Sequence, residues 1–472
     1  MRIEIGFAIL FAAVSASAQM PGAFTPTSRM TSARFGHTAT LLGDGKVLVA
    51  GGGVASAELY DPSSGAFRPT GSMTKPRSHH RATLLPDGKV LISDADSAEI
   101  YDPSAGTFRL AGRMTAARDG HSATLLTTGK VLIAGGGCGG ASTPPPAAAS
   151  AELYDPASDT FAATGNMTVA RCNPRETLLA DGRVLILPGD EGADYGSAEI
   201  YDPTTGTFSP IDWPNPQELI AATSNLLLNG NVLVSLAVQE CDFLSSTALV
   251  YDSAALAFKA GPDMANGVCR PTATLLSDGK VLIAAGWFAG THAQLYDPAT
   301  GAFSPTGNLT TYRQDHAATL LQDGTVLITG GASPVGSPLD LGAYGFSATD
   351  TAELYHPARV FPAPGLLSLN GSSQGAVLHA GTGRVVSAGD PAAPGEPIEI
   401  YATGLMDSSV VPPLVAIGGR AAEILYFGNA PGLSGVNQIN VRVPNGLHPG
   451  AAVSIQMSYL GRSSNAVTIG VQ

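Results

Sequence analysis

The sequence predicts an all-β protein with two parts, a seven-bladed β-propeller followed by a β-sandwich. Two short phrases each occur seven times between residues 20 and 362, and repeats of this length indicate stacked or radially arranged units. Glycine (57 residues) and proline (34 residues) are abundant, which is typical of short strands joined by tight turns. Residues 365–472 contain neither phrase and show strand-like alternation of their own.

The first phrase predicts a β-hairpin in every repeat. It consists of two apolar runs split by a glycine turn, most often Asp-Gly, and tight hairpin turns need residues that accept positive φ. The seven copies are ATLLGDGKVL (39–48), ATLLPDGKVL (82–91), ATLLTTGKVL (123–132), ETLLADGRVL (176–185), SNLLLNGNVL (224–233), ATLLSDGKVL (273–282) and ATLLQDGTVL (318–327). We name its two strands a and b.

The second phrase predicts two further strands, c and d. Strand c ends at a tyrosine followed by Asp or His, and in six repeats a turn and a phenylalanine follow. The tyrosines are Tyr60, Tyr101, Tyr154, Tyr201, Tyr251, Tyr296 and Tyr355. The phenylalanines are Phe67, Phe108, Phe161, Phe208, Phe258 and Phe303. One such four-stranded sheet cannot bury both faces, whereas seven packed around an axis can.

These residues resemble the kelch repeat. Paired glycines close strand b at 51–52, 135–136 and 330–331, a tyrosine lies in strand c, and an aromatic residue lies in strand d. The resemblance covers roughly residues 20–360. It implies a seven-bladed kelch β-propeller.

The seventh repeat lacks strand d, and the missing phrase stands at the other end of the chain. GAFTPTSRM (22–30) matches GAFRPTGSM (65–73) and GAFSPTGNL (301–309), but no strand c precedes it. We therefore expect the N-terminal strand to complete blade 7, which closes the ring and removes open sheet edges.

Residues 365–472 predict a small Ig-like β-sandwich. Their apolar stretches include PIEIYATGL (397–405), VNQINVRVP (436–444) and AAVSIQMSYL (451–460). They resemble an Ig-like C-terminal domain of secreted bacterial proteins, notably from acidobacteria, a family without an assigned chemistry.

The N-terminus predicts export. Arg2, the apolar run 5–14 and the small residues 16–18 fit a signal peptide covering residues 1–18, so we expect a secreted protein, extracellular or periplasmic. We expect no membrane span, because no apolar stretch is long enough. The net charge of −13 argues against a nucleic-acid partner. We expect a monomer.

Arginine and histidine recur just before strand a and are candidates for a binding face. The arginines are Arg34, Arg77, Arg118, Arg171 and Arg313, and the histidines three residues later are His37, His80, His121 and His316. In the closed ring the four histidines would form an arc, which is a possible transition-metal site. Alternatively, both residue types are structural and tie neighbouring blades by hydrogen bonds, and this interpretation is favoured.

The loops between strands b and c are acidic. Asp94 and Asp96, then Asp190, Glu191 and Asp194, then Glu240 and Asp242, could bind calcium. Their spacing is irregular, so a solvated acidic rim is favoured.

The four cysteines predict two disulfides. Cys172 and Cys269 occupy the same repeat position before strand a, and Cys138 and Cys241 both follow strand b. Four cysteines allow three pairings, and we expect 138–172 and 241–269, which join neighbouring blades. Two pairs of reduced thiols are the alternative.

The architecture of a seven-bladed kelch propeller followed by an Ig-like domain resembles galactose oxidase. That family uses copper held by two tyrosines and two histidines, one of them from the C-terminal domain. His316 matches the last-blade histidine, but the tyrosine positions hold Asp315 and Arg270. His379 and His448 are the C-terminal candidates for the remaining ligand. We therefore expect no metal or cofactor.

These patterns predict a binding or interaction protein for an extracellular glycan or protein. The alternative is a galactose oxidase-like copper oxidase of carbohydrate alcohols. The HExxH and P-loop motifs of other enzyme classes do not occur in the sequence. We therefore expect no catalytic residues.

Overall fold

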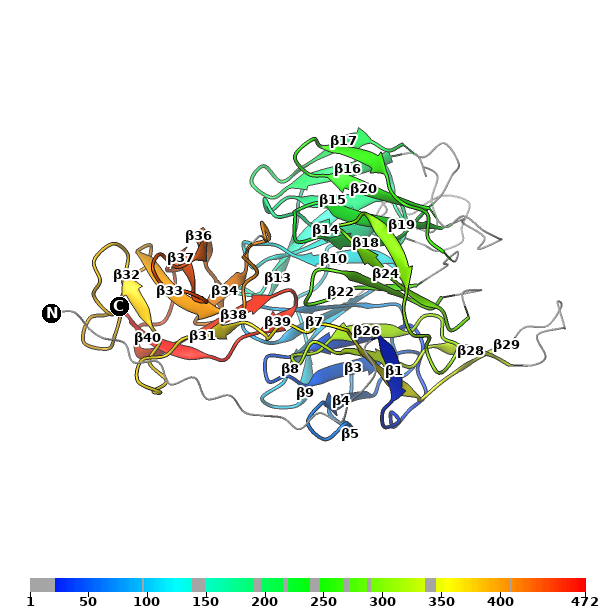
Figure 1. The fold of residues 1–472 in the computed structure, drawn as a ribbon, viewed down its shortest axis with the longest axis horizontal. Coiled ribbons are helices and arrows are strands. Elements are labelled where there is room, and N and C mark those ends of the chain that lie inside the picture. Colours follow the sequence, from blue (N-terminus) through cyan, green and yellow to red (C-terminus); the bar gives the residue numbers. More distant parts are fainter. Residues whose placement is uncertain are drawn as a thin grey trace.

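The computed structural model describes residues 22–95, 97–137, 149–189, 197–214, 220–237, 247–265, 271–286, 290–335, 345–407 and 409–472. In these ranges the regular elements are strands (Figure 1). None of the described segments forms a helix with the length and apolar character needed to cross a membrane.

Seven four-stranded antiparallel sheets, counted within the described residues, form the blades of the propeller. Blade 1 contains β2 (His37–Leu41), β3 (Val47–Gly51), β4 (Ala57–Asp61) and β5 (Ala66–Pro69). Blade 2 contains β6 (Arg81–Leu84), β7 (Val90–Asp94), β8 (Ser97–Asp102) and β9 (Thr107–Leu110). Blade 3 contains β10 (His121–Leu125), β11 (Val131–Gly135), β12 (Ala151–Asp155) and β13 (Thr160–Ala163). Each is one a-b-c-d repeat of the sequence.

The remaining blades follow the same order. Blade 4 contains β14 (Arg175–Leu178), β15 (Val184–Leu187), β16 (Ser197–Asp202) and β17 (Thr207–Asp212). Blade 5 contains β18 (Ile220–Leu226), β19 (Val232–Ala237), β20 (Ala248–Asp252) and β21 (Ala257–Ala260). Blade 6 contains β22 (Thr272–Leu275), β23 (Val281–Ala284), β24 (Ala293–Asp297) and β25 (Ala302–Pro305). Blade 7 contains β26 (Ala317–Leu320), β27 (Val326–Thr329), β30 (Ala352–His356) and β1 (Ala23–Pro26).

The a strands form the inner wall of the propeller. β2, β6, β10, β14, β18, β22 and β26 contact one another in sequence, and β26 contacts β2, so the ring is closed. Between the blades, the b strands are wholly buried, as in Val47–Gly51 and Val232–Ala237. Apolar side chains of adjacent blades thus form one continuous series of interblade cores.

Blade 7 is completed by the N-terminal strand, as the displaced phrase predicts. β1 pairs with β30, with Phe24 opposite Tyr355. Their ring centroids lie 4.9 Å apart, and the Tyr–Phe pairs of the other six blades lie 4.7 to 5.2 Å apart. The N-terminal strand therefore occupies the same place in its blade as every other strand d.

Between β27 and β30 the chain forms an additional hairpin, β28 (Ala332–Val335) and β29 (Gly345–Ala348). This hairpin extends from the propeller on the side away from the C-terminal part of the chain (Figure 1).

The C-terminal residues form a β-sandwich of two sheets. One contains β31 (Gly365–Leu366), β32 (Val377–His379), β33 (Pro397–Thr403), β36 (Glu423–Asn429) and β37 (Asn437–Arg442). The other contains β34 (Leu414–Ile417), β35 (Arg420–Ala421), β38 (Gly450–Tyr459), β39 (Arg462–Ser463) and β40 (Val467–Val471). Alternate residues such as Ile398 and Ile400 point into a core of their own.

The sandwich lies at the end of the propeller where the turns between strands a and b are found (Figure 1). The amide of Val410 donates to the carbonyl of Leu228 in the blade 5 turn at 3.0 Å. The buried Arg462 donates to the carbonyl of Phe361 in the connecting segment at 2.8 Å. The opposite end of the propeller, formed by the d–a and b–c loops, faces away from the sandwich; we call it the loop face.

Replacing Phe24 by alanine should destabilise the propeller as much as replacing Phe67, its counterpart in blade 1. Both side chains are buried and stacked on a tyrosine, so each change should cost about 3–5 kcal/mol. The free energy of unfolding of both variants, measured by chemical denaturation, checks this equality. A Phe24→Ala loss below about 1 kcal/mol would show that the N-terminal strand does not close the ring.

Candidate ligand-binding site at the centre of the loop face

All five candidate arginines are buried and form ion pairs with a glutamate of strand c in the blade that follows them. Arg34 donates through Nε to Glu58 at 3.0 Å, and both side chains are fully buried. The other pairs are Arg77–Glu99 (2.7 Å), Arg118–Glu152 (2.6 Å), Arg171–Glu199 (3.0 Å) and Arg313–Glu353 (2.8 Å). The arginines are therefore satisfied within the blades rather than presented to a ligand.

Each glutamate also holds the chain segment that enters its blade. Glu58 accepts the backbone N–H of Thr31 at 2.7 Å, and Arg34 donates to the carbonyls of Gly51 and Ser56. The same backbone bond from a threonine occurs at Glu99, Glu152, Glu199 and Glu353. The pair thus fixes the crossover from one blade to the next.

Blades 5 and 6 lack both members of this pair. Leu249 and Gln294 stand at the glutamate position and are buried, while Gln217 and Val268 stand at the arginine position of the sequence. A buried charge without a partner lowers the stability of the fold, so a blade is expected to have both the arginine and the glutamate or neither.

The four candidate histidines tie neighbouring blades. Nε2 of His37 is hydrogen-bonded to the hydroxyl of Thr329 in blade 7 at 2.8 Å. The equivalent bonds are His80–Thr38 (2.9 Å), His121–Ser93 (2.8 Å) and His316–Thr272 (2.8 Å). The described residues contain no group of three or more His, Cys, Asp or Glu placed to hold a metal ion. The contacts of the arginines and histidines match the structural interpretation that the sequence favoured.

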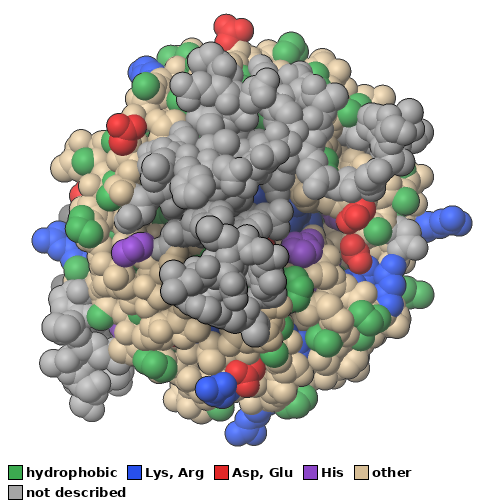
Figure 2. All heavy atoms as spheres, turned by 90° about the vertical axis from the view of Figure 1, so that its right-hand side faces the viewer, with side chains coloured by type: hydrophobic (Ala, Val, Ile, Leu, Met, Phe, Trp, Pro, Cys, Tyr) green, Lys and Arg blue, Asp and Glu red, His purple; other side chains and the backbone are tan. Residues whose placement is uncertain are grey.

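A cavity of about 620 Å³ lies at the centre of the loop face, above these buried residues. Residues from all seven blades line it: Gly36, His37, Thr38, Ala39, Thr40, His79, His80, Arg81, Ala82, Asp119, Gly120, Asn173, Arg175, Ala222, Pro271, Thr272, Asp315 and His316. Figure 2 shows this face, with basic and histidine side chains toward its middle. The lining is polar and supplies both donors and acceptors.

The rim of this cavity is built from residues in the left-handed conformation. The residue two positions after each candidate arginine has φ of 62° at Gly36, 56° at His79, 69° at Gly120, 49° at Asn173 and 51° at Asp315. His, Asn and Asp are the non-glycine residues that accept this conformation most readily. We call these five residues the left-handed ring.

Backbone hydrogen bonds connect the left-handed ring around the axis. The amide of Gly36 donates to the carbonyl of Asp315 at 2.9 Å, and the amide of His79 donates to that of Gly36 at 2.7 Å. The amide of Asn173 donates to the carbonyl of Gly120 at 2.7 Å. These bonds fix the backbone at His79, Asn173 and Asp315, and so the points from which their side chains leave the rim of the cavity.

Sequence reasoning predicted His37, His80 and His316 of this lining but missed two arginines. Arg81 and Arg175 stand four positions after the candidate arginines of their blades, where other blades have Thr, Ser or Ala. Arg81 donates through Nε to the carbonyl of His121 at 2.7 Å, and Arg175 donates to that of Ala222 at 3.0 Å. Both arginines depart from the repeat, and this departure is the signal that distinguishes them, whereas the predicted residues stand at positions that the repeat preserves.

Glu176 is another departure from the repeat, since other blades have Ala or Ser at this position of strand a. Thr124 donates to its Oε2 at 2.7 Å, and its buried Oε1 has no hydrogen-bond partner. Burial raises the pKa of Glu176 to about 7. Its carboxyl therefore exchanges a proton near neutral pH, within the wall between blades 3 and 4.

The histidines of the sandwich lie in its own structure. His448 is exposed. His379 is buried and hydrogen-bonded to Glu396, and it also faces Asp390. Burial lowers the pKa of His379, but the bond to Glu396 and the two carboxylate charges outweigh burial and raise it.

Several other predicted features fall outside the described residues. Among the acidic loop residues, Asp94 is described and contacts the guanidinium of Arg77 at 3.3 Å, whereas Asp96, Asp190, Glu191, Asp194, Glu240 and Asp242 are not. Cys172 is buried and disulfide-bonded. Cys138, Cys241 and Cys269 lie outside the described residues, so the pairings 138–172 and 241–269 stay a prediction, and Arg270 lies outside them too.

Comparison with known proteins supports the fold. No protein-family model matches the chain, and no curated protein matches it. The chain resembles the solved structure of a fungal alcohol oxidase, described as novel and catalytically diverse among the AA5 family and in complex with copper. The TM-score is 0.61 at 17 % identity, over 96 % of this chain and 99 % of that chain. This similarity shows a galactose oxidase-like fold.

Removing one member of a buried Arg–Glu pair should be more harmful than removing both. Arg118→Gln leaves Glu152 buried without its partner, which should cost about 3–5 kcal/mol. The double variant Arg118→Gln/Glu152→Leu reproduces the residues of blade 5, Gln217 and Leu249, and should recover more than half of that loss. Free energies of unfolding of the two variants provide the comparison. A double variant no more stable than Arg118→Gln would contradict this account.

Replacing His316 by glutamine should weaken the pH dependence of propeller stability. Burial, with the charge of nearby arginines, lowers the pKa of His37, His80 and His316 to about 3, and burial lowers that of His121 to about 4. Histidine in the unfolded chain has a pKa of about 6.5. Below this pH the unfolded chain binds more protons than the folded protein, so the free energy of unfolding falls as the pH falls toward 3. Each such histidine contributes about 1.4 kcal/mol per pH unit in this window.

Chemical denaturation between pH 4.5 and 6.5 measures this slope. We expect His316→Gln to decrease it by about 1.4 kcal/mol per pH unit. Glu176→Gln should increase it, because the raised pKa of Glu176 makes the folded state the better proton binder in this range. An unchanged slope in His316→Gln would mean that this imidazole already titrates normally in the folded protein.

Proposed function

We propose that the protein is an exported binding protein that holds a carbohydrate in the central cavity of the loop face. The observation that carries this proposal is the cavity itself, about 620 Å³ in volume, with residues from all seven blades, several of them polar, around one space. Cavities of this size with a few fixed polar groups are typical ligand sites.

The chemistry of the rim suits a neutral sugar. His79, Arg81, Asn173 and Arg175 supply donors, and Asp119 and Asp315 supply acceptors, so a hydroxyl group finds both kinds of partner. Next to the rim, Phe35 is 39 % exposed and its ring lies 6.4 Å from that of His79. An exposed aromatic face beside hydrogen-bonding groups favours the apolar face of a sugar ring.

The second candidate is a copper oxidase of carbohydrate alcohols, favoured by the likeness to the AA5 alcohol oxidase in complex with copper. Copper(II) in proteins is held by several converging nitrogen and oxygen ligands. Here Nε2 of His316 is bonded to Thr272, and Asp315 contributes a carbonyl and a strained backbone to the ring. His379 is bonded to Glu396 inside the sandwich. The described donor set does not fit a copper centre of that family.

Calorimetric titration with a panel of galactose-, glucose- and mannose-containing oligosaccharides tests the binding function. At least one sugar should bind the intact protein. Asp315→Asn and His79→Asn keep a residue that accepts the left-handed conformation. Each should weaken binding by about tenfold or more, Asp315→Asn through the loss of a charge-assisted hydrogen bond and His79→Asn through the loss of the imidazole as a hydrogen-bonding group. Asp323→Asn, in the blade 7 turn on the opposite end, is the matched control and should leave affinity unchanged.

The outcome against the proposal is absence of binding across the panel, or an equal effect of Asp323→Asn. Stoichiometric copper together with peroxide release on addition of galactose would instead establish the oxidase.

A further inference from the structure

A second cavity lies at the opposite end of the inner wall, between the propeller and the sandwich. It has two lobes of about 420 and 730 Å³, and Leu125 and Leu414 line both. The smaller lobe and the carbohydrate cavity share Ala39, Thr40 and Ala82 in their linings, so the two spaces approach each other along the inner strands. We call the two lobes together the junction cavity.

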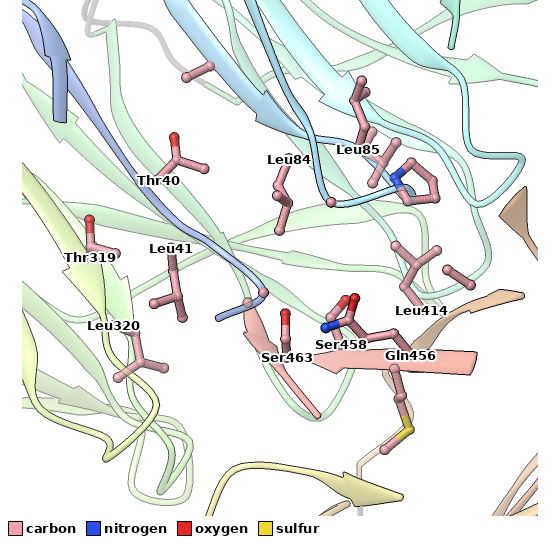
Figure 3. A pocket seen from close by; sticks show the side chains of 18 of the residues that line it. Thr40, Leu41, Leu84, Leu85, Thr319, Leu320, Leu414, Gln456, Ser458 and Ser463 are labelled. Atoms are coloured by element: carbon pink, nitrogen blue, oxygen red, sulfur yellow. The ribbon is translucent and has the colours of Figure 1, made fainter. Parts of the chain in front are cut away.

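The propeller wall of the junction cavity is a series of leucines at one repeat position. Each is the first leucine of the hairpin phrase, as in ATLL. They are Leu41, Leu84, Leu125, Leu178, Leu226 and Leu320. Figure 3 shows Leu41, Leu84 and Leu320 at the smaller lobe, opposite Leu414 of the sandwich. Leu84, Leu125, Leu178 and Leu226 remain half-buried although they face the interior of the molecule.

The sandwich wall is also apolar. In the larger lobe Val411, Leu414, Ile424 and Phe427 face the leucines of blades 3 to 5. Beside them Leu425 is 41 % exposed and Tyr426 is 45 % exposed. Apolar surface on two facing walls, left open by the docking of two domains, is a feature of ligand clefts.

The charged residues that line the junction cavity do not favour an ionic ligand. Among the described residues that line it, Asp181 and Glu423 carry charge, and no Lys, Arg or His does. Asp181 is paired with Arg183 at 2.7 Å and Glu423 with Arg442 at 2.8 Å. An anion finds no cationic partner there, and a cation meets carboxylates that are already paired.

We propose that the junction cavity binds an uncharged molecule with an extended alkyl chain. The two lobes adjoin at Leu125 and Leu414 and so suit an elongated molecule rather than a compact one, and mostly apolar walls favour apolar guests. Gln456, Ser458 and Ser463 of the sandwich, seen in Figure 3, supply hydrogen-bonding groups for one polar end such as a hydroxyl. This site is separate from the proposed carbohydrate cavity and does not depend on it.

Nile red fluorescence, with 1-decanol as competitor, tests the proposal on the intact protein. The dye is uncharged and its emission shifts to the blue in an apolar cavity. We expect saturable binding of one dye per chain and displacement by 1-decanol. Leu125→Trp and Leu178→Trp fill the cavity from the propeller side and should each weaken binding by about tenfold or more.

Leu275→Trp is the matched control, because Leu275 holds the same repeat position in blade 6 but lines neither lobe. It should bind the dye like the unmodified protein. Thermal melting of all three variants reports whether each is folded, and Leu178→Trp decides the matter if Leu125→Trp does not fold. No saturable binding, or equal binding in Leu178→Trp and Leu275→Trp, would overturn the proposal.

Discussion

Pairing of the first strand with the last blade is the constraint on which the rest of the structure depends. A four-stranded blade buries its faces only against two neighbours, so seven blades are stable only as a closed ring. β1 provides that closure through β30, and Phe24 on Tyr355 repeats the stacking of every other blade. Residues of blades 7 and 1 line both the cavity of the loop face and the smaller lobe of the junction cavity, so ring closure shapes both spaces.

Repetition separates the structural residues from the candidate functional ones. Arg34 and His37 recur because each performs the same task in its blade, one fixing the crossover and the other tying two inner strands. Where a blade lacks the arginine it also lacks the glutamate, as at Leu249, which is what a buried ion pair requires. The cavity of the loop face is lined by three of these histidines and also by positions where the repeats differ, including His79 and Arg175.

The sequence was sufficient for the fold because its signals are local and repeated seven times. The hairpin turns, the Tyr–Phe spacing and the displaced GAFTP each specify a strand and its partner. The site was harder to predict, because Arg34 could bind either a ligand or a glutamate of its own chain. The structure shows that Arg34 is buried and paired with Glu58, 24 residues later in the sequence. The glutamate of strand c, as in AELYD, occurs in the same five repeats as the arginine, and this co-occurrence indicates an ion pair. The junction cavity depends on how two domains dock, which no local pattern encodes.

The inner wall of the propeller has polar side chains at the loop face and apolar side chains at the sandwich end. The same strand a that places Asp315 or His79 at the loop face places a leucine at the sandwich end, with alanine and threonine between them. Ligands of opposite character would therefore occupy opposite ends without competing. The wall between them contains Glu176, whose carboxyl is buried, half-satisfied and raised in pKa to about 7. Because burial raises this pKa, a change in the hydration of the wall would alter the charge of Glu176.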